Sequence, residues 1–233
     1  GHVESVNTKT ATAEWIGSFN EDFSKAEEDV AAYIDYAEQA GYKQIILAGH
    51  SLGANKVIYY LSKNPDARVA KFIFISPANV RHLTSVVTEE EKQLVLDYID
   101  TGRGQEPLPF PLLGWIPCLA DTAYQWLYTT TLDNVHVEAH RDFSQIENIE
   151  HSGAMIIGTY DRFTYGDPCG FLRTINAHLP SADENELIFI QQTGHTYQGK
   201  EQQLADSILH LVMKWKNERL VEEQLHAVYP LEG

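Results

Sequence analysis

The sequence predicts an α/β fold with a mostly parallel sheet and helices on both faces. Four short apolar runs rich in Ile alternate with segments of helical periodicity. Such continuous apolar runs are typical of parallel strands, because helices cover both faces of a parallel sheet. The 233 residues, of which 43% are hydrophobic, suit a single globular domain with a sizeable core, with or without a small insertion.

The first helix is expected over residues 23–41. Phe23, Val30 and Ile34 recur near a 3.6-residue period there, and Gly41 is placed to end the helix. The remaining elements follow the same alternation: a strand at 45–49, a helix over 54–64 ending before Pro65, strands at 71–76, 154–161 and 186–195, and an amphipathic helix over 201–218.

Residues 78–150 do not fit the strand–helix alternation. They contain two helical patterns, at 88–99 and 120–132, around a Pro- and Gly-rich aromatic segment at 102–117. We therefore expect residues 1–77 and 151–233 to form the α/β core, with 78–150 inserted between two strands as a lid or cap.

The charge and the cysteine content exclude several classes of partner. Lys plus Arg total 17 against 33 Asp plus Glu, which gives a formal charge of −16. Such an acidic surface repels nucleic acid and anionic lipid. No apolar run approaches the ~20 residues of a membrane span, and the N-terminus does not have the pattern of a signal peptide. Cys118 and Cys169 match neither a disulfide framework nor a zinc pattern, so two free thiols and a cytoplasmic location are expected.

Residues 49–53, GHSLG, place a serine between two glycines where an apolar run meets a helical pattern. Gly-x-Ser-x-Gly in this context is the nucleophile-elbow pattern. Its strained turn exposes the hydroxyl of Ser51, and Gly49 and Gly53 are expected to be small because backbone segments pass closely. The next helix begins beneath the serine, so the backbone N–H of Leu52 is the predicted oxyanion-hole donor. The alternative is a purely structural turn.

A serine hydroxyl needs a base and an orienting acid to act as a nucleophile. Asp161 ends the strand at 154–161, and His195 follows the strand residues LIFIQQ, 187–192, in the loop TGHT. The chain order Ser, Asp, His is the order of this arrangement. Asp161 as a turn or helix-cap residue is the alternative, with Asp167 as the rival acid.

The segments GHSLG, IIGTYD and TGHT resemble the α/β-hydrolase family, in its lid-bearing esterase and lipase form, over roughly residues 20–225. The resemblance implies that Ser51 is the nucleophile, His195 the general base and Asp161 the residue that orients it. It implies a serine hydrolase that cleaves a small-molecule ester or thioester through an acyl-enzyme, with no cofactor and no metal. A receptor-like homologue that binds a small molecule with little turnover is the alternative.

Aromatic residues of the insertion are candidates for the substrate pocket. Trp115, Tyr124 and Trp126 could line an apolar acyl site, and ordinary packing within the lid is the alternative. The segment HVEAH places His136 and His140 four residues apart, as in some metal sites. A third ligand is missing from the pattern, so we expect an exposed polar segment there instead.

The family usually has about four further strands before the elbow, which also supply a second oxyanion donor. Only 44 residues precede the elbow strand here, and they show one clear helix and no strong strand. Gly1 and His2 resemble the tail of an Arg-Gly-His loop that follows the last of those strands. We therefore expect the N-terminal part of the fold to be missing, because the sequence is truncated, because the protein has two chains, or because the form is minimal, and a missing segment is favoured. A sheet edge would then be left open, which a homo-oligomer or a partner chain would cover.

Overall fold

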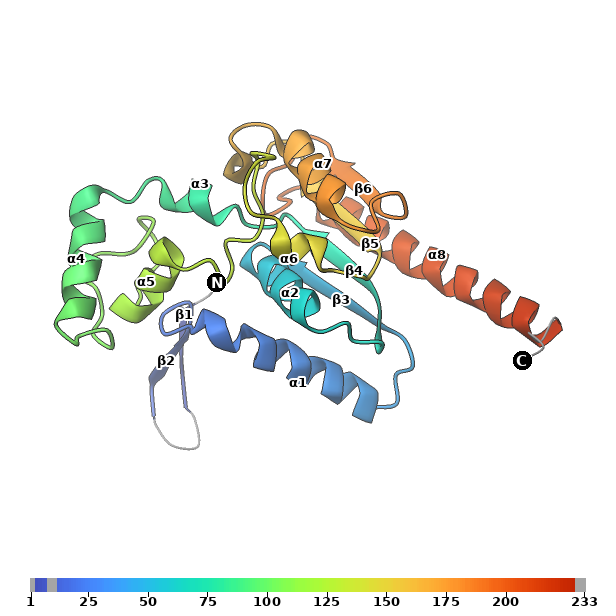
Figure 1. Ribbon diagram of the computed structural model, residues 1–233, viewed down its shortest axis with the longest axis horizontal. Helices are drawn as coiled ribbons and strands as arrows, with labels where there is room; N and C mark the ends of the chain where they lie inside the picture. Colours follow the sequence, from blue (N-terminus) through green and yellow to red (C-terminus); the bar gives the residue numbers. More distant parts are fainter. Residues whose placement is uncertain (1–2, 8–11, 229–233) are drawn as a thin grey trace.

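The computed structural model describes residues 3–7 and 12–228 and has the predicted α/β architecture. Its main sheet contains β3 (Ile45–His50), β4 (Val69–Ile75), β5 (Gly153–Gly158) and β6 (Glu186–Ile190), in that spatial order. All three neighbouring pairs are parallel. The carboxyl ends of the four strands therefore meet at one edge of the sheet, where the loops that carry the candidate residues begin (Figure 1).

Helices cover both faces of this sheet, because side chains of successive strand residues point to opposite sides. Phe72 and Phe74 of β4 pack with α1 (Ala26–Gln39), α2 (Leu52–Lys63) and α7 (Pro168–His178). Ile73 and Ile75 of the same strand pack on the other face, with Leu211 and Trp215 of the last helix. That helix is α8 (Glu201–Val228), which continues ten residues beyond the predicted end.

The start and the end of α1 follow from local capping. The Asp22 side chain accepts a hydrogen bond from the Ser24 N–H and caps η1 (Phe23–Lys25), a single 3-10 turn that leads into α1. At the other end, Gly41 has a φ of +89°, a conformation that glycine adopts without steric cost and that stops the helix.

The chain between β4 and β5 contains the helices α3 (Val80–Thr84), α4 (Glu89–Asp100), α5 (Ala120–Tyr128) and α6 (Ser144–Glu147). In Figure 1, α4 and α5 lie to one side of the sheet, away from α8. Their apolar side chains form a separate cluster that also contains Leu52 of α2. The domain boundaries at 77/78 and 150/151 stay a prediction.

A buried asparagine joins this segment to the helix beneath Ser51. Asn55 of α2 is fully buried, and its side-chain amide donates to the carbonyl oxygens of Ala78 and Leu132, at 2.8 and 2.9 Å. Its Oδ1 accepts from the backbone N–H of Ala78 at 2.9 Å. Because an unpaired buried amide is costly, these bonds fix the start of the inserted segment and its backbone at Leu132 against α2.

The short helices α3 and α6, the hairpin before α1, and helix α7 were not predicted from the sequence. An antiparallel hairpin of β1 (Val3–Val6) and β2 (Glu14–Gly17) precedes α1, although no strong strand was expected there. Both strands have only four residues, which is too short for a clear alternation of apolar and polar side chains. Helix α7 was also missed, although Asp167 and Pro168 are a typical helix start. Gly1 and His2 lie outside the described residues.

One edge of β3 pairs with β4, and within the described part of the chain its other edge has no strand neighbour. A groove of about 860 Å³ runs along that edge, between β3, α1 and β2. Both cysteines are free, with Cys118 buried. None of the described helices is long and apolar enough to cross a membrane. The covering of the open edge and the cytoplasmic location stay predictions.

Candidate active site

Ser51 lies at the sharp turn between β3 and α2. Its φ of 56° and ψ of −131° put it in a conformation that residues with a side chain rarely adopt. Its backbone N–H donates to the Ile75 carbonyl oxygen at 3.0 Å, so the β3–β4 pairing extends to the serine itself. A Cβ at Gly49 would overlap the backbone carbonyl of Gly53, so the turn requires glycine at position 49.

The expectation that Gly53 must also be small is wrong. A Cβ added there would meet no atom within 4 Å. The predicted need for a small residue therefore applies to Gly49 alone, because it is the Gly53 carbonyl, and not its Cα hydrogens, that makes the close approach.

Asp161, His195 and Ser51 form one chain of hydrogen bonds. His195 Nε2 lies 2.8 Å from Ser51 Oγ, and His195 Nδ1 lies 2.9 Å from Asp161 Oδ2. Since a carboxylate can only accept, Nδ1 carries the proton and Nε2 is free to accept the serine hydroxyl. The side chain of Asp161 is 1% exposed and that of His195 is 14% exposed. Three residues far apart in the sequence thus meet at the carboxyl edge of the sheet.

The Asp161 carboxylate is held from two directions. Its Oδ1 accepts from the Phe163 N–H at 3.0 Å and caps η2 (Arg162–Thr164), while Oδ2 faces His195. The cap and the imidazole contact are therefore both present, where the sequence presented them as alternatives. The rival Asp167 caps α7 instead, through a 2.8 Å bond from the Gly170 N–H.

The loop that carries His195 is fixed by its neighbours. Gly158 at the end of β5 permits it to pass, since a Cβ there would overlap the carbonyl oxygens of Thr193 and Gly194. His50 Nε2 lies 2.8 Å from the His195 carbonyl oxygen and must donate to it. The Phe163 ring packs edge-on against the His195 ring, with centroids 4.5 Å apart. No role was predicted for Phe163, because its position depends on the η2 turn.

Leu52 is the first residue of α2, directly after Ser51. The N–H groups of a first helical turn have no acceptor within the helix, and the helix dipole places positive potential there. The role of the Leu52 N–H as an oxyanion-hole donor stays a prediction. Its side chain is 6% exposed and packs into the apolar cluster of the inserted segment.

A family model described as a protein of unknown function (DUF1749) matches residues 3–140, more than half of the chain. The chain belongs to this family.

Solved structures give the fold. A monoacylglycerol lipase from Paleococcus ferrophilus has 15% identity and a TM-score of 0.60 over 84% of this chain and 77% of that chain. A thermostable carboxyl esterase from Bacillus coagulans has 13% identity and a TM-score of 0.60, over 86% and 74%. The esterase EaEST from Exiguobacterium antarcticum has 16% identity and a TM-score of 0.51, over 86% and 76%. The fold is that of an α/β-hydrolase. No curated protein matches the sequence.

The aromatic residues predicted for the substrate pocket differ in their surroundings. Trp115 is 55% exposed and lines a cavity together with Phe163, which contacts His195. Trp126 is 5% exposed and packs edge-on against Phe23, in the apolar cluster of the inserted segment. Tyr124 lines another cavity, with Asn20 and other residues. Of the three, Trp115 is the residue that shares a cavity with a neighbour of the triad.

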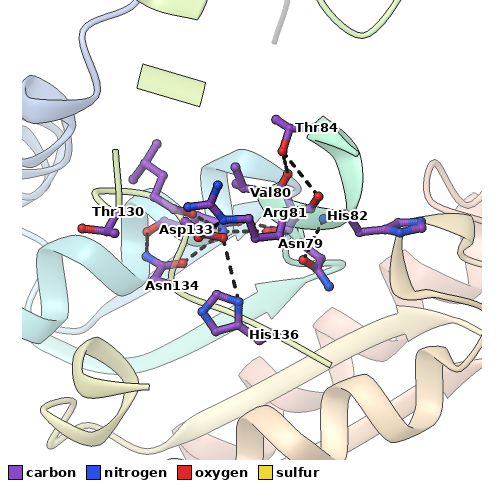
Figure 2. Close-up of polar contacts among 12 residues, drawn as sticks. Asn79, Val80, Arg81, His82, Thr84, Thr130, Asp133, Asn134 and His136 are labelled. Carbon is purple, nitrogen blue, oxygen red and sulfur yellow. Dashed lines mark hydrogen bonds and ion pairs between the residues drawn. The ribbon is translucent and has the colours of Figure 1, made fainter. Parts of the chain in front are cut away.

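The expectation of an exposed polar segment at HVEAH is wrong for His136, which is 2% exposed. Figure 2 shows it beside Asp133, whose carboxylate pairs with Arg81 at 2.9 Å. His136 Nδ1 lies 3.8 Å from Asp133 Oδ1, and burial of the imidazole lowers its pKa. Residues 136–140 are not helical, and no group of three metal-ligating side chains occurs within the described ranges.

Proposed function

We propose that this chain is a serine hydrolase that cleaves a carboxylic ester or thioester. One observation carries the proposal: the hydrogen-bonded chain from Asp161 through His195 to Ser51, with the serine on a strained turn at the start of a helix. This arrangement of an acid, a base and an exposed hydroxyl is the one that acyl transfer to serine requires.

In the first half of the reaction, Ser51 Oγ attacks the carbonyl carbon while His195 Nε2 takes the hydroxyl proton. The carbonyl oxygen becomes an oxyanion, and the Leu52 N–H at the start of α2 donates to it. When the tetrahedral intermediate collapses, His195 returns the proton to the leaving oxygen or sulfur, and an acyl-enzyme remains on Ser51.

In the second half, a water molecule loses its proton to His195 Nε2 and attacks the acyl carbon. The new intermediate collapses, Ser51 Oγ recovers the proton, and the acid is released. Asp161 accepts from Nδ1 throughout, which holds the ring and stabilises the imidazolium that forms twice in each cycle. Asp161 is suited to this role because the η2 backbone fixes its carboxylate independently of the imidazole.

The names of the structural neighbours support the same chemistry. The lipase and the two esterases are named for ester hydrolysis, and they share the fold that brings the three residues together here.

The proposal is tested with p-nitrophenyl acetate and an acyl thioester as substrates. Ser51→Ala should lower turnover by about 10⁴- to 10⁶-fold relative to the wild type. Ser62→Ala is the matched control, because Ser62 lies on the same helix, donates only to the Tyr59 carbonyl, and has no contact with His195. Hydrolysis that survives in Ser51→Ala at the wild-type rate would reject the nucleophile. A wild-type chain that accumulates acyl-Ser51 without releasing acid would be a binding protein instead.

A further inference from the structure

A cavity of about 220 Å³ lies next to the Phe163 ring, between η2 and two parts of the inserted segment, residues 82–86 and 113–115. Its walls are mostly apolar: Leu83, Val86, Leu113, Trp115 and Phe163. Val86 and Trp115 are 66% and 55% exposed, so the cavity is open to solvent on one side. Large exposed apolar groups around a concavity are typical of a ligand site.

The cavity adjoins the imidazole side of the candidate active site. Phe163 is shared between the cavity wall and the edge-on contact with His195. His195 Nε2 is the atom that would return the proton to the leaving oxygen, so this oxygen must come within hydrogen-bond distance of Nε2. A cavity one ring away from His195 is therefore placed to receive the group attached to that oxygen.

The cavity also contains a cation. Arg162 lines it, and the ion pairs of the described residues include those of Arg68, Arg81 and Arg103 but none of Arg162. The backbone of Arg162 is fixed, because its carbonyl accepts from His82 Nε2 at 3.1 Å and the preceding Asp161 caps η2. In Figure 2 the His82 ring points away from the Asp133 side chain, so it lies on this side of α3 and not beside the Arg81–Asp133 pair.

The positive charge of Arg162 contrasts with the overall charge of the chain. The chain carries a formal charge of −16, so its field repels anionic substrates in general. An arginine at this cavity reverses that preference locally, and the planar donors of a guanidinium match a carboxylate or phosphate in a bidentate geometry. An apolar cavity of about 150 Å³ holds benzene, so one of 220 Å³ takes a group of about one ring.

We infer that the substrate has a leaving group of about one ring in size that carries an anionic substituent, with Arg162 as the specificity-determining residue. The inference rests on the proposed hydrolase function. The apolar part of the leaving group would lie against Trp115 and Phe163, and its carboxylate or phosphate would bind the Arg162 guanidinium.

The kinetic test compares two acetate esters with the same ring, 4-acetoxybenzoate and its neutral analogue 4-acetoxybenzamide. The wild type should favour the anion by about tenfold in kcat/KM, as one charge-assisted contact at a partly exposed site would give. Arg162→Gln should remove this ratio, and Arg162→Lys should retain part of it. The control is Arg103→Gln, because Arg103 is a partly exposed arginine elsewhere in the inserted segment. This variant should keep the wild-type ratio. The ester 4-acetoxyphenyl phosphate separates a phosphate preference from a carboxylate preference.

A binding measurement separates this inference from the proposed function. Calorimetry on Ser51→Ala with the products 4-hydroxybenzoate and 4-hydroxybenzamide needs no turnover. Tighter binding of the anion, lost in Ser51→Ala/Arg162→Gln, supports the inference even if Ser51 proves not to be the nucleophile. Equal affinity for the two products, or a preference for the anion that Arg162→Gln leaves intact, overturns it even if Ser51 forms an acyl-enzyme.

Discussion

Strands β3 and β5 both have six residues, and both lead into a residue of the candidate triad, yet their surroundings differ. Every residue of β5 is buried, and the strand pairs with β4 on one side and β6 on the other. No residue of β3 is fully buried, and only β4 pairs with it within the described part of the chain. Ser51 thus follows one of the least covered strands of the sheet, and Asp161 follows the most covered one.

The difference shows that burial of a strand is not what positions Ser51. Three local contacts do so instead: the hydrogen bond from its N–H to Ile75, the close approach of Gly49 to Gly53, and the contact of its Oγ with His195. Asp161, in contrast, extends from a rigid core strand. Substitutions at the two strands should therefore affect activity and stability to different extents.

The largest effect is expected at the end of β5. Asp161→Asn should lower kcat by about 10⁴-fold, because an amide can donate to Nδ1 and so favours the wrong imidazole tautomer. Asp167→Asn is the matched control: it caps α7 and should leave kcat within about twofold. Steady-state kinetics with an ester substrate measures both variants. If Asp161→Asn is as active as the control, the acid has been assigned to the wrong residue.

The second largest effect is expected on stability, where substitutions in β5 and β3 should differ in the free energy of unfolding that they cost. Ile156→Ala in β5 removes a side chain that is 0% exposed and should lower the free energy of unfolding by about 3–4 kcal/mol. Ile46→Ala in β3 removes a half-buried side chain and should cost about 1 kcal/mol. Urea denaturation of both variants gives the two values. Equal losses would mean that the open edge of β3 is covered in solution.

The two glycines of the elbow provide a smaller and more local comparison. Gly49→Ala should destabilise the protein by about 2–3 kcal/mol and reduce activity, because its methyl group would overlap the Gly53 carbonyl. Gly53→Ala has room and should change the stability by less than about 1 kcal/mol, with helix propensity favouring alanine. Thermal unfolding and an ester assay on both variants check this. Similar losses for the two variants would contradict the described turn.

The smallest effect is expected in the pH dependence of stability, through His136 in the segment that leads into β5. Burial lowers the pKa of His136 below its ordinary value of 6.5, so in acid the unfolded chain binds a proton that the folded chain does not. The unfolding free energy should therefore fall as the pH drops below about 6.5, by about 1 kcal/mol over one pH unit for this single group. Denaturation between pH 5 and 7 measures the slope, which His136→Gln should reduce. An unchanged slope would show that other groups dominate.

Much of the core followed from periodicity. The four strands, the long helices and the position of each candidate triad residue at a strand end were predictable, because the apolar runs and the turn residues around Ser51, Asp161 and His195 are local signals. The hairpin before α1 was not, since four-residue strands give no clear pattern. Helix α7 could have been predicted from Asp167-Pro168 and the spacing of Phe171, Leu172 and Ile175.

The surroundings of the triad were less predictable. Trp115 and Trp126 look alike in the sequence, yet one is exposed at a cavity and the other is in a core, because the difference depends on how the inserted segment folds back. The expectation that His136 is exposed was wrong, because its burial also depends on how the inserted segment folds back. The positions of Phe163 and Arg162 depend on the η2 turn. The sequence indicates an aspartate cap for this turn but does not specify its geometry further.

The central claim is that Ser51 is the reactive nucleophile of this α/β-hydrolase fold. Incubation with a fluorophosphonate, followed by intact-mass measurement and peptide mapping, tests it most directly. We predict one adduct per chain, located on the peptide that contains Ser51, present in Ser62→Ala and absent from Ser51→Ala. An adduct on another residue, or one that persists in Ser51→Ala, would contradict the account.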